Sequence, residues 1–155
     1  MPSAHPHRNF NFLVEIDGIE RAAFSEATLP SAELQVVEYR EGADKTSISR
    51  KLPGRLKLGN LVLKRGIADD LTLWNWFKTV AEGDFDRRNV VVTLLDSSRQ
   101  PVRRWELHDA WITKIEGPTL NASANEVAIE TLELTCERLE LECCLLYTSD
   151  AADEL

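Results

Sequence analysis

Alternating apolar and polar residues along most of the chain predict a protein built mainly of β-strands. In the first strand the apolar side chains occupy every second position, at Phe10, Phe12, Val14 and Ile16. Asp17-Gly18 then supplies the residue types that a tight hairpin turn prefers, and residues 19–27 form the expected return strand. Further strands are predicted over residues 34–39, 56–64, 90–95, 102–115 and 126–139.

The expected last strand changes phase in its middle. Val127 and Ile129 alternate with polar residues, but the apolar positions shift by one residue from Leu132 onward. An extra residue on one strand of a pair produces such a change, so we predict a β-bulge near Glu130-Thr131.

One segment has a helical period instead. Its apolar residues recur at i, i+3, i+4 and i+7 and form the expected core face of a short helix: Leu73, Trp76, Phe77 and Val80. Asp69 or Asp70 can cap the start of this helix, and Gly83 lies just beyond its end. Trp74 lies off the apolar stripe, which makes it a possible interface anchor rather than a core residue.

The order of these elements predicts the fold class. We expect a mainly β protein, an antiparallel β-sandwich or barrel with one short α-helix and a long inter-strand loop. With 155 residues, of which 43% are hydrophobic, the chain can bury the core of one domain, which we place at residues 1–142.

The long loop follows Tyr39 and is rich in charge. Residues 40–55 carry basic and acidic side chains, a Pro-Gly pair and few apolar residues. Such a segment cannot be stabilised by its own burial, so we expect it to become ordered against another molecule. Pro53-Gly54 is predicted to form a turn within it; a phosphate-binding loop is disfavoured because the required glycine and lysine spacing is missing.

The net charge of the chain argues against one class of function. A formal charge of −8 argues against sequence-specific binding of nucleic acid, which needs clustered cations. No run approaches the roughly 18 apolar residues that span a bilayer, and the first ten residues lack the apolar segment of a signal peptide. We therefore expect synthesis in the cytoplasm and no membrane partner.

The C-terminal residues 143–155 differ in kind from the rest. CLLYTSDAADE, from Cys144 onward, resembles the translation of a sequencing-library adapter, so we expect a non-native, disordered tail here. Without the three acidic residues of that tail, 18 basic and 23 acidic residues remain, a net charge of −5.

Candidate chemistry is sparse. Cys136 is the clear internal cysteine, which rules out a disulfide framework and is typical of a small core residue. His5 and His7 have no third metal ligand at suitable spacing, and His108 has no recognisable nucleophile beside it. We therefore predict no catalytic residues, no metal, no cofactor and no enzymatic activity.

Several ordered motifs carry a family resemblance. They are VEIDGIERAAFSE at residues 14–26, VVEYREG at 36–42, KLPGRLKLGNLVLKRG at 51–66, LWNWF at 73–77 and GPTLNASANEVAIETLEL at 117–134. With them the chain resembles the tail tube proteins of contractile phages and of phage-derived extracellular contractile injection systems. The resemblance covers residues 9–140, and its departures lie at the two ends.

The resemblance implies a structural protein of a virion tail or an extracellular injection particle, assembled in the bacterial cytoplasm. Hexameric rings would stack into a tube inside a tail sheath protein, with baseplate or tube-initiator proteins at one end. DNA or protein cargo would pass through the lumen without sequence-specific binding, and six chains of charge −5 would give each ring roughly −30. It also implies that the long segment reaches the neighbouring ring. The expected inter-subunit or inter-ring residues are Tyr39, Arg40, Glu41, Asp44, Lys45, Arg50, Lys51, Pro53, Gly54, Arg55 and Lys57.

Rival functions stay open at this point. One is a baseplate tube-initiator or a ring-forming tube protein like that of type VI secretion. Another is a monomeric β-domain that binds a peptide or small ligand on an exposed strand edge.

Overall fold

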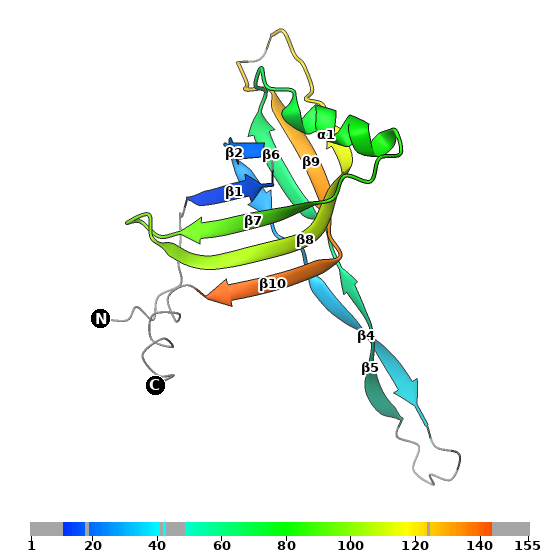
Figure 1. The fold of residues 1–155 in the computed structure, drawn as a ribbon. Helices are drawn as coiled ribbons and strands as arrows, with labels where there is room; N and C mark the ends of the chain where they lie inside the picture. Colours follow the sequence, from blue (N-terminus) through cyan, green and yellow to red (C-terminus); the bar gives the residue numbers. More distant parts are fainter. Residues whose placement is uncertain (1–10, 18, 41, 43–48, 124, 144–155) are drawn as a thin grey trace.

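Antiparallel strands make up most of the computed structural model, which describes residues 11–17, 19–40, 42, 49–123 and 125–143 (Figure 1). The strands before the helix are β1 (Phe12–Ile16), β2 (Ile19–Ala22), β3 (Glu26–Thr28), β4 (Ala32–Tyr39), β5 (Arg50–Leu58) and β6 (Leu61–Gly66). The helix α1 (Thr72–Ala81) follows, and then β7 (Arg88–Leu95), β8 (Pro101–Glu116), β9 (Ile129–Thr135) and β10 (Arg138–Cys143). The predicted fold class, mainly β and antiparallel with one short helix, is confirmed within these residues.

The long strand β8 joins the two halves of the main sheet. The sheet runs β2-β1-β7-β8-β9-β6-β3, with β10 also paired to β8, and a second sheet consists of β4 and β5. The first half of β8 pairs with β7 and β10, and its second half pairs with β9. Between the halves Asp109 has a φ of 55°, a conformation that Asp tolerates better than most residues, and β8 curves around the core here (Figure 1).

The core lies between the two halves of this curved sheet and the helix. Its buried residues come from β1, β6, β7, β8, β9, α1 and the residue after β9: Val14, Ile16, Leu61, Leu63, Leu73, Trp76, Val90, Val92, Leu107, Ala110, Ile112, Leu132, Leu134 and Cys136. Cys136 is thus a core residue, as predicted.

The helix packs as its apolar stripe predicts. Leu73 and Trp76 are buried, and Phe77 and Val80 pack against the core from its edge. The indole N–H of Trp76 donates a hydrogen bond to the Asp86 carbonyl oxygen (2.8 Å), so burial leaves no unpaired donor.

The two ends of the helix differ in how well they match the prediction. The N-cap residue is Leu71, not Asp69 or Asp70, because the helix begins only at Thr72; Asp70 lies just before the N-cap and accepts a hydrogen bond from the N–H of Thr72 (2.8 Å). Gly83 lies just past the C-terminal end with a φ of +102°, where its missing Cβ matters.

Three predicted strands are each divided in two. Residues 19–27 form β2 and β3, which pair with β1 and β6 respectively. Residues 56–64 belong to β5 and β6, and the predicted last strand is β9 followed by β10. The predicted bulge near Glu130-Thr131 is wrong, because β9 is in regular register with β6 there. The phase change has another cause: Val127 precedes β9 and is exposed, so only the later apolar positions face the core.

A buried ion pair ties β6 to β9. The two side chains stand opposite each other in the register, and Arg65 Nε lies 2.9 Å from Glu130 Oε2. The Arg65 side chain is only 8% exposed, so the Glu130 carboxylate supplies the opposite charge that offsets the cost of burying the guanidinium.

Candidate functional site

The hairpin of β4 and β5 extends away from the body of the protein (Figure 1). We call its described residues, 32–40 and 49–58, the arm. Ala32 is opposite Leu58 at its base and Tyr39 is opposite Arg50 near its tip. The segment predicted as a long loop is therefore largely a two-stranded ribbon, because β5 begins at Arg50 and not after Arg55.

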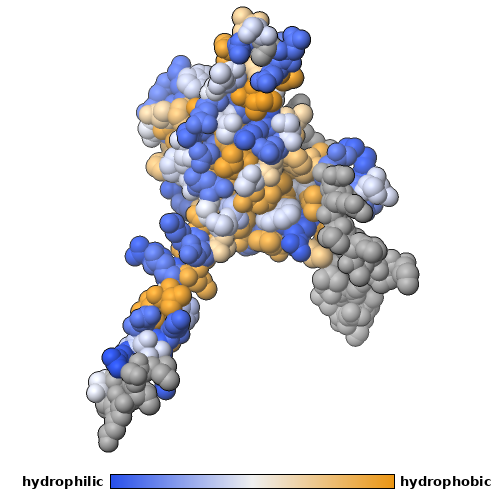
Figure 2. Space-filling model, turned by 180° about the vertical axis from the view of Figure 1, so that it is seen from behind, coloured by the Kyte–Doolittle hydropathy of each residue, from blue (hydrophilic) through white to orange (hydrophobic). Residues whose placement is uncertain are grey.

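The arm exposes apolar side chains that a solvated hairpin would not need. Six of them are each about half exposed or more: Leu34, Val36, Val37, Tyr39, Leu52 and Leu56. Figure 2 shows hydrophobic side chains along the arm, in orange, among hydrophilic ones. An isolated two-stranded hairpin is marginally stable in water, so this surface indicates a binding role.

The register divides these side chains between the two faces of the ribbon. Residues opposite each other share a face, and side chains along a strand alternate between faces. Leu34 pairs with Leu56, and the same face continues to Val36, opposite Pro53. We call Leu34, Val36 and Leu56 the base patch.

The second apolar group lies on the other face, toward the tip. Val37 is opposite Leu52, and Tyr39 follows two residues later on the same face. We call Val37, Tyr39 and Leu52 the tip patch. Charged residues complete each face: Glu33 is opposite Lys57 beside the tip patch, and Glu38 is opposite Lys51 beside the base patch.

Pro53-Gly54 does not form the predicted turn. Both residues lie inside β5, where the register shifts between Leu34 and Val36, so β5 carries an extra residue at this point. Gly54 is required for close packing rather than for a positive φ. A Cβ added there would lie 2.8 Å from Val37 Cγ2 and 3.1 Å from the Gln35 carbonyl oxygen.

Most predicted interface residues lie together on this arm. Those with exposed side chains are Tyr39, Arg40, Arg50, Lys51, Pro53, Arg55 and Lys57. Glu41, Asp44 and Lys45 fall outside the described residues. Of the apolar patch residues, sequence reasoning named only Tyr39 as an interface residue. It missed Leu52 because it took the β5 residues before Leu56 to be loop, and it gave Leu34, Val36, Val37 and Leu56 no interface role.

The exposed Trp74 adds a second surface feature on α1. Its side chain is 47% exposed and stacks beside Phe77, with ring centroids 5.7 Å apart. Phe77 in turn packs on the core. The ring of Trp74 is therefore held in position by a fixed neighbour while its outer face is open to solvent.

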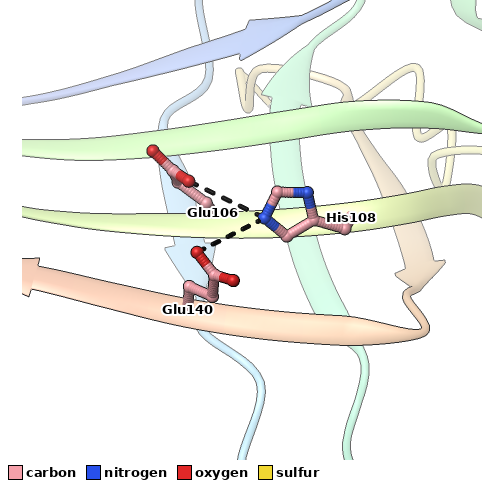
Figure 3. A group of neighbouring side chains, drawn as sticks. All are labelled: Glu106, His108 and Glu140. Carbon is pink, nitrogen blue, oxygen red and sulfur yellow. Dashed lines mark ion pairs between the residues drawn. The ribbon is translucent and has the colours of Figure 1, made fainter.

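The polar face of β8 and β10 carries a cluster of one histidine and two glutamates (Figure 3). Glu106 and Glu140 stand directly opposite each other, and His108 Nε2 lies 3.7 Å from a carboxylate oxygen of each. The sequence could not predict this cluster, because the pairing of β10 with β8 that brings Glu140 to it was not predicted.

The remaining oxygens of these glutamates are paired with arginines. Arg104 lies 3.3 Å from Glu106 Oε1, and Arg138 lies 3.2 Å from Glu140 Oε1. The outcome is a network of alternating charges across β8 and β10, in which a protonated His108 would be attracted to both carboxylates. One possible metal-ligand atom from each of Glu106, His108 and Glu140 lies within 4.8 Å of the other two, a spacing that also suits a small cation.

Three titratable groups have pKa shifts with a clear structural cause. Lys114 Nζ lies 2.8 Å from Glu116 Oε1 at the end of β8, and this pairing raises the pKa of Lys114 and lowers the pKa of Glu116. Burial raises the pKa of the Cys136 thiol, so its reactive thiolate form is disfavoured.

A search of the described residues finds no helix with the length and apolar character to cross a membrane.

Solved structures of several other proteins share this fold. A chain in the cryo-EM structure of the anti-feeding prophage baseplate, 6-fold symmetrised, is 28% identical with a TM-score of 0.75, over 92% of this chain and 97% of that one. A chain in the sheath-tube complex of the PVC extracellular contractile injection system is 20% identical with a TM-score of 0.79, over 90% and 93%. Hcp1 from Salmonella typhimurium is 14% identical with a TM-score of 0.56, over 86% of each chain.

No curated protein matches the sequence significantly. The sequence model of the T4-like virus tail tube protein gp19 family, however, matches residues 8–140, which is nearly all of the chain that forms the fold. This match confirms the resemblance drawn from the ordered motifs. The chain belongs to the T4-like tail tube protein family.

Proposed function

We propose that this protein is the structural subunit of the inner tube of a contractile tail or injection particle, and that it acts as a hexameric ring stacked on further rings. Its partners are then other copies of itself, a surrounding sheath protein and a baseplate. The ring count is supported by the 28%-identical chain, which was determined in a 6-fold symmetrised baseplate. No reaction is assigned to the protein.

The arm is the observation that carries this proposal. It presents six large apolar side chains outside the core, on a hairpin that has no other part of the described body packed over its faces. A tube subunit needs such a segment to reach the next ring, and burial of these side chains there would offset the cost of ordering the arm.

The open edges of the main sheet favour contacts between neighbouring subunits of a ring. Its path runs from β2 to β3, and no pairing among the described residues closes it into a barrel. Unpaired strand edges are a liability for a monomer, but an assembling protein can use them to pair with neighbours. The polar face of β8 and β10, with its alternating charges, is suited to water in a lumen through which DNA or protein cargo passes.

A second candidate within the same class is the tube initiator of the baseplate. It is favoured by the 28%-identical chain, whose structure is that of a baseplate. The two roles share ring formation and differ in what lies beneath the first ring.

Analytical ultracentrifugation of the full chain, followed by negative-stain electron microscopy, tests the proposal. Rings or tubes with six-fold symmetry are expected. A protein that stays monomeric up to its solubility limit would contradict the ring assignment and favour a monomeric β-domain that binds peptide or ligand on an exposed edge.

A further inference from the structure

We infer that each arm bridges two other copies of this chain at once, one on the base patch and a different one on the tip patch. This inference rests on the proposed tube function and adds to it the number of partners that each arm contacts. It follows from the position of the apolar side chains on the ribbon, independently of any solved relative.

The two patches point in opposite directions. Leu34 and Leu56 face one way and Val37 and Leu52 face the other, because the register places each pair on its own face. All four side chains are between 47% and 55% exposed. A single flat surface can therefore cover one patch and must leave the other in water.

One partner could cover both patches only if it enclosed the ribbon in a slot. Packed layers lie about 10 Å apart, so a slot that holds the ribbon between two walls is about 20 Å wide. The seam between two adjacent copies supplies two walls without any such slot in one chain.

Charge identifies the partner as a second copy of this chain. The arm carries five basic and two acidic side chains. The residues outside 32–58, without the three acidic residues of the expected non-native tail, contain twelve basic and nineteen acidic ones. The arm is therefore positive and the rest of the chain is strongly negative. An arm is attracted to the bodies of sister copies, and the bodies on both sides of a seam contribute to that attraction.

The offset of the patches along the ribbon fits the same arrangement. The base patch is centred near Leu34 and the tip patch near Val37 and Tyr39, about 10–17 Å farther out at 3.4 Å per residue. On each face the remaining half is charged, with Glu38 and Lys51 on one side and Glu33 and Lys57 on the other. Each of the two partners thus meets an apolar half and a charged half.

Photocrosslinking counts the partners directly. A tagged chain carries p-benzoylphenylalanine in place of Leu56, of Leu52 or of both, two exposed positions on opposite faces of β5. It is mixed as a small minority with unlabelled full-length chain, the sedimenting assemblies are collected and irradiated, and tagged products are separated under denaturing conditions. Each single-site chain serves as the control for the chain with both sites.

The expected result is a two-chain product from each single-site chain and a three-chain product from the chain with both sites. Two-chain products alone from the double-site chain would overturn the inference and leave the tube proposal standing. Assemblies that sediment but yield no crosslinked sister chain would also overturn it. Failure of the unlabelled protein to sediment would instead contradict the proposed function.

Discussion

Gly54 and Val37 lie against each other across the arm, so closely that a Cβ at position 54 would be 2.8 Å from Val37 Cγ2. The contact lies where β5 carries its extra residue, and Val37 belongs to the tip patch. The two strands of the arm can approach this closely only because Gly54 has no side chain. The same Cβ would lie 3.1 Å from the Gln35 carbonyl oxygen. That oxygen belongs to the backbone and cannot rotate away as a side chain could.

Gly54→Ala is therefore expected to distort the arm and to raise the protein concentration needed for assembly at least several-fold. The free energy of unfolding should fall by less than about 1 kcal/mol, because Gly54 is outside the core. Sedimentation and urea unfolding measure the two effects. Gly42→Ala is the matched control, since a Cβ at Gly42 meets nothing within 4 Å. Equal assembly by both variants would show that the close contact does not shape the arm.

Reversing the charge of the arm should weaken assembly more than folding. Lys51→Glu and Arg55→Glu remove positive charge from a segment that we expect to meet the acidic bodies of other copies. Sedimentation should show less assembly for both, with a smaller loss for Lys78→Glu on the exposed side of α1. Added salt should reduce the difference between each variant and the parent, because it screens exposed charges. Loss of thermal stability in parallel with assembly would argue for damage to the monomer instead.

The buried pair of Arg65 and Glu130 should be worth more than a surface pair on the same strand. Glu130→Ala leaves an arginine that is 8% exposed without its carboxylate, so we expect a loss of about 3 kcal/mol in the free energy of unfolding. The control Glu26→Ala removes the partner of Lys64, where both side chains are 44% and 58% exposed, and should cost less than about 1 kcal/mol. Urea unfolding compares them, and similar losses would contradict this ranking.

Trp76→Ala should destabilise the fold by about 3–5 kcal/mol, because it removes a large side chain from the centre of the core. It also leaves the Asp86 carbonyl oxygen without the indole N–H that it accepts. Trp76→Phe should recover part of this loss by filling most of the cavity. Thermal unfolding followed by circular dichroism checks both, and a loss below 1 kcal/mol for the alanine variant would mean that α1 does not close the core.

Trp74→Ala is expected to affect assembly and to leave the stability of the fold nearly unchanged, unlike Trp76→Ala. Its side chain is 47% exposed, so the free energy of unfolding should change by less than about 1 kcal/mol. If Trp74 anchors an interface, assembly measured by sedimentation should fall several-fold. Normal assembly of this variant would remove Trp74 from the proposed contact residues.

The sequence predicted the elements whose burial pattern is simple. The helix was found because Leu73, Trp76, Phe77 and Val80 share a face that packs on the core. The strand β8 was found as one long or bent element because both of its halves keep an apolar face. In these cases local periodicity and tertiary packing agree.

The first part of β5, before Leu56, was predicted as loop because its periodicity is masked, whereas β4 was predicted as a strand. The apolar residues of the arm switch from one face to the other along the ribbon, and an extra residue at Gly54 breaks the alternation in β5. Pro and Gly inside a strand then favour a turn by local preference. The described interface residues named from the family resemblance lie on the arm, but the division of its exposed apolar side chains into two patches became visible only with the register.

The Glu106, His108 and Glu140 cluster depended on pairing that no local pattern contains. Glu140 is separated from Glu106 by β9 in the chain, and only the pairing of β10 with β8 places them opposite each other. The same holds for Arg65 and Glu130, which are 65 residues apart. Polar residues brought together by long-range pairing are the part of this structure that sequence reasoning could not reach.

Electron cryomicroscopy of the assembled full-length protein tests the central claim most directly. The account predicts stacked six-fold rings in which both faces of every arm are buried against sister chains. A closed single copy whose arm folds back on its own body, or rings that stack with the arms free in solvent, would contradict it.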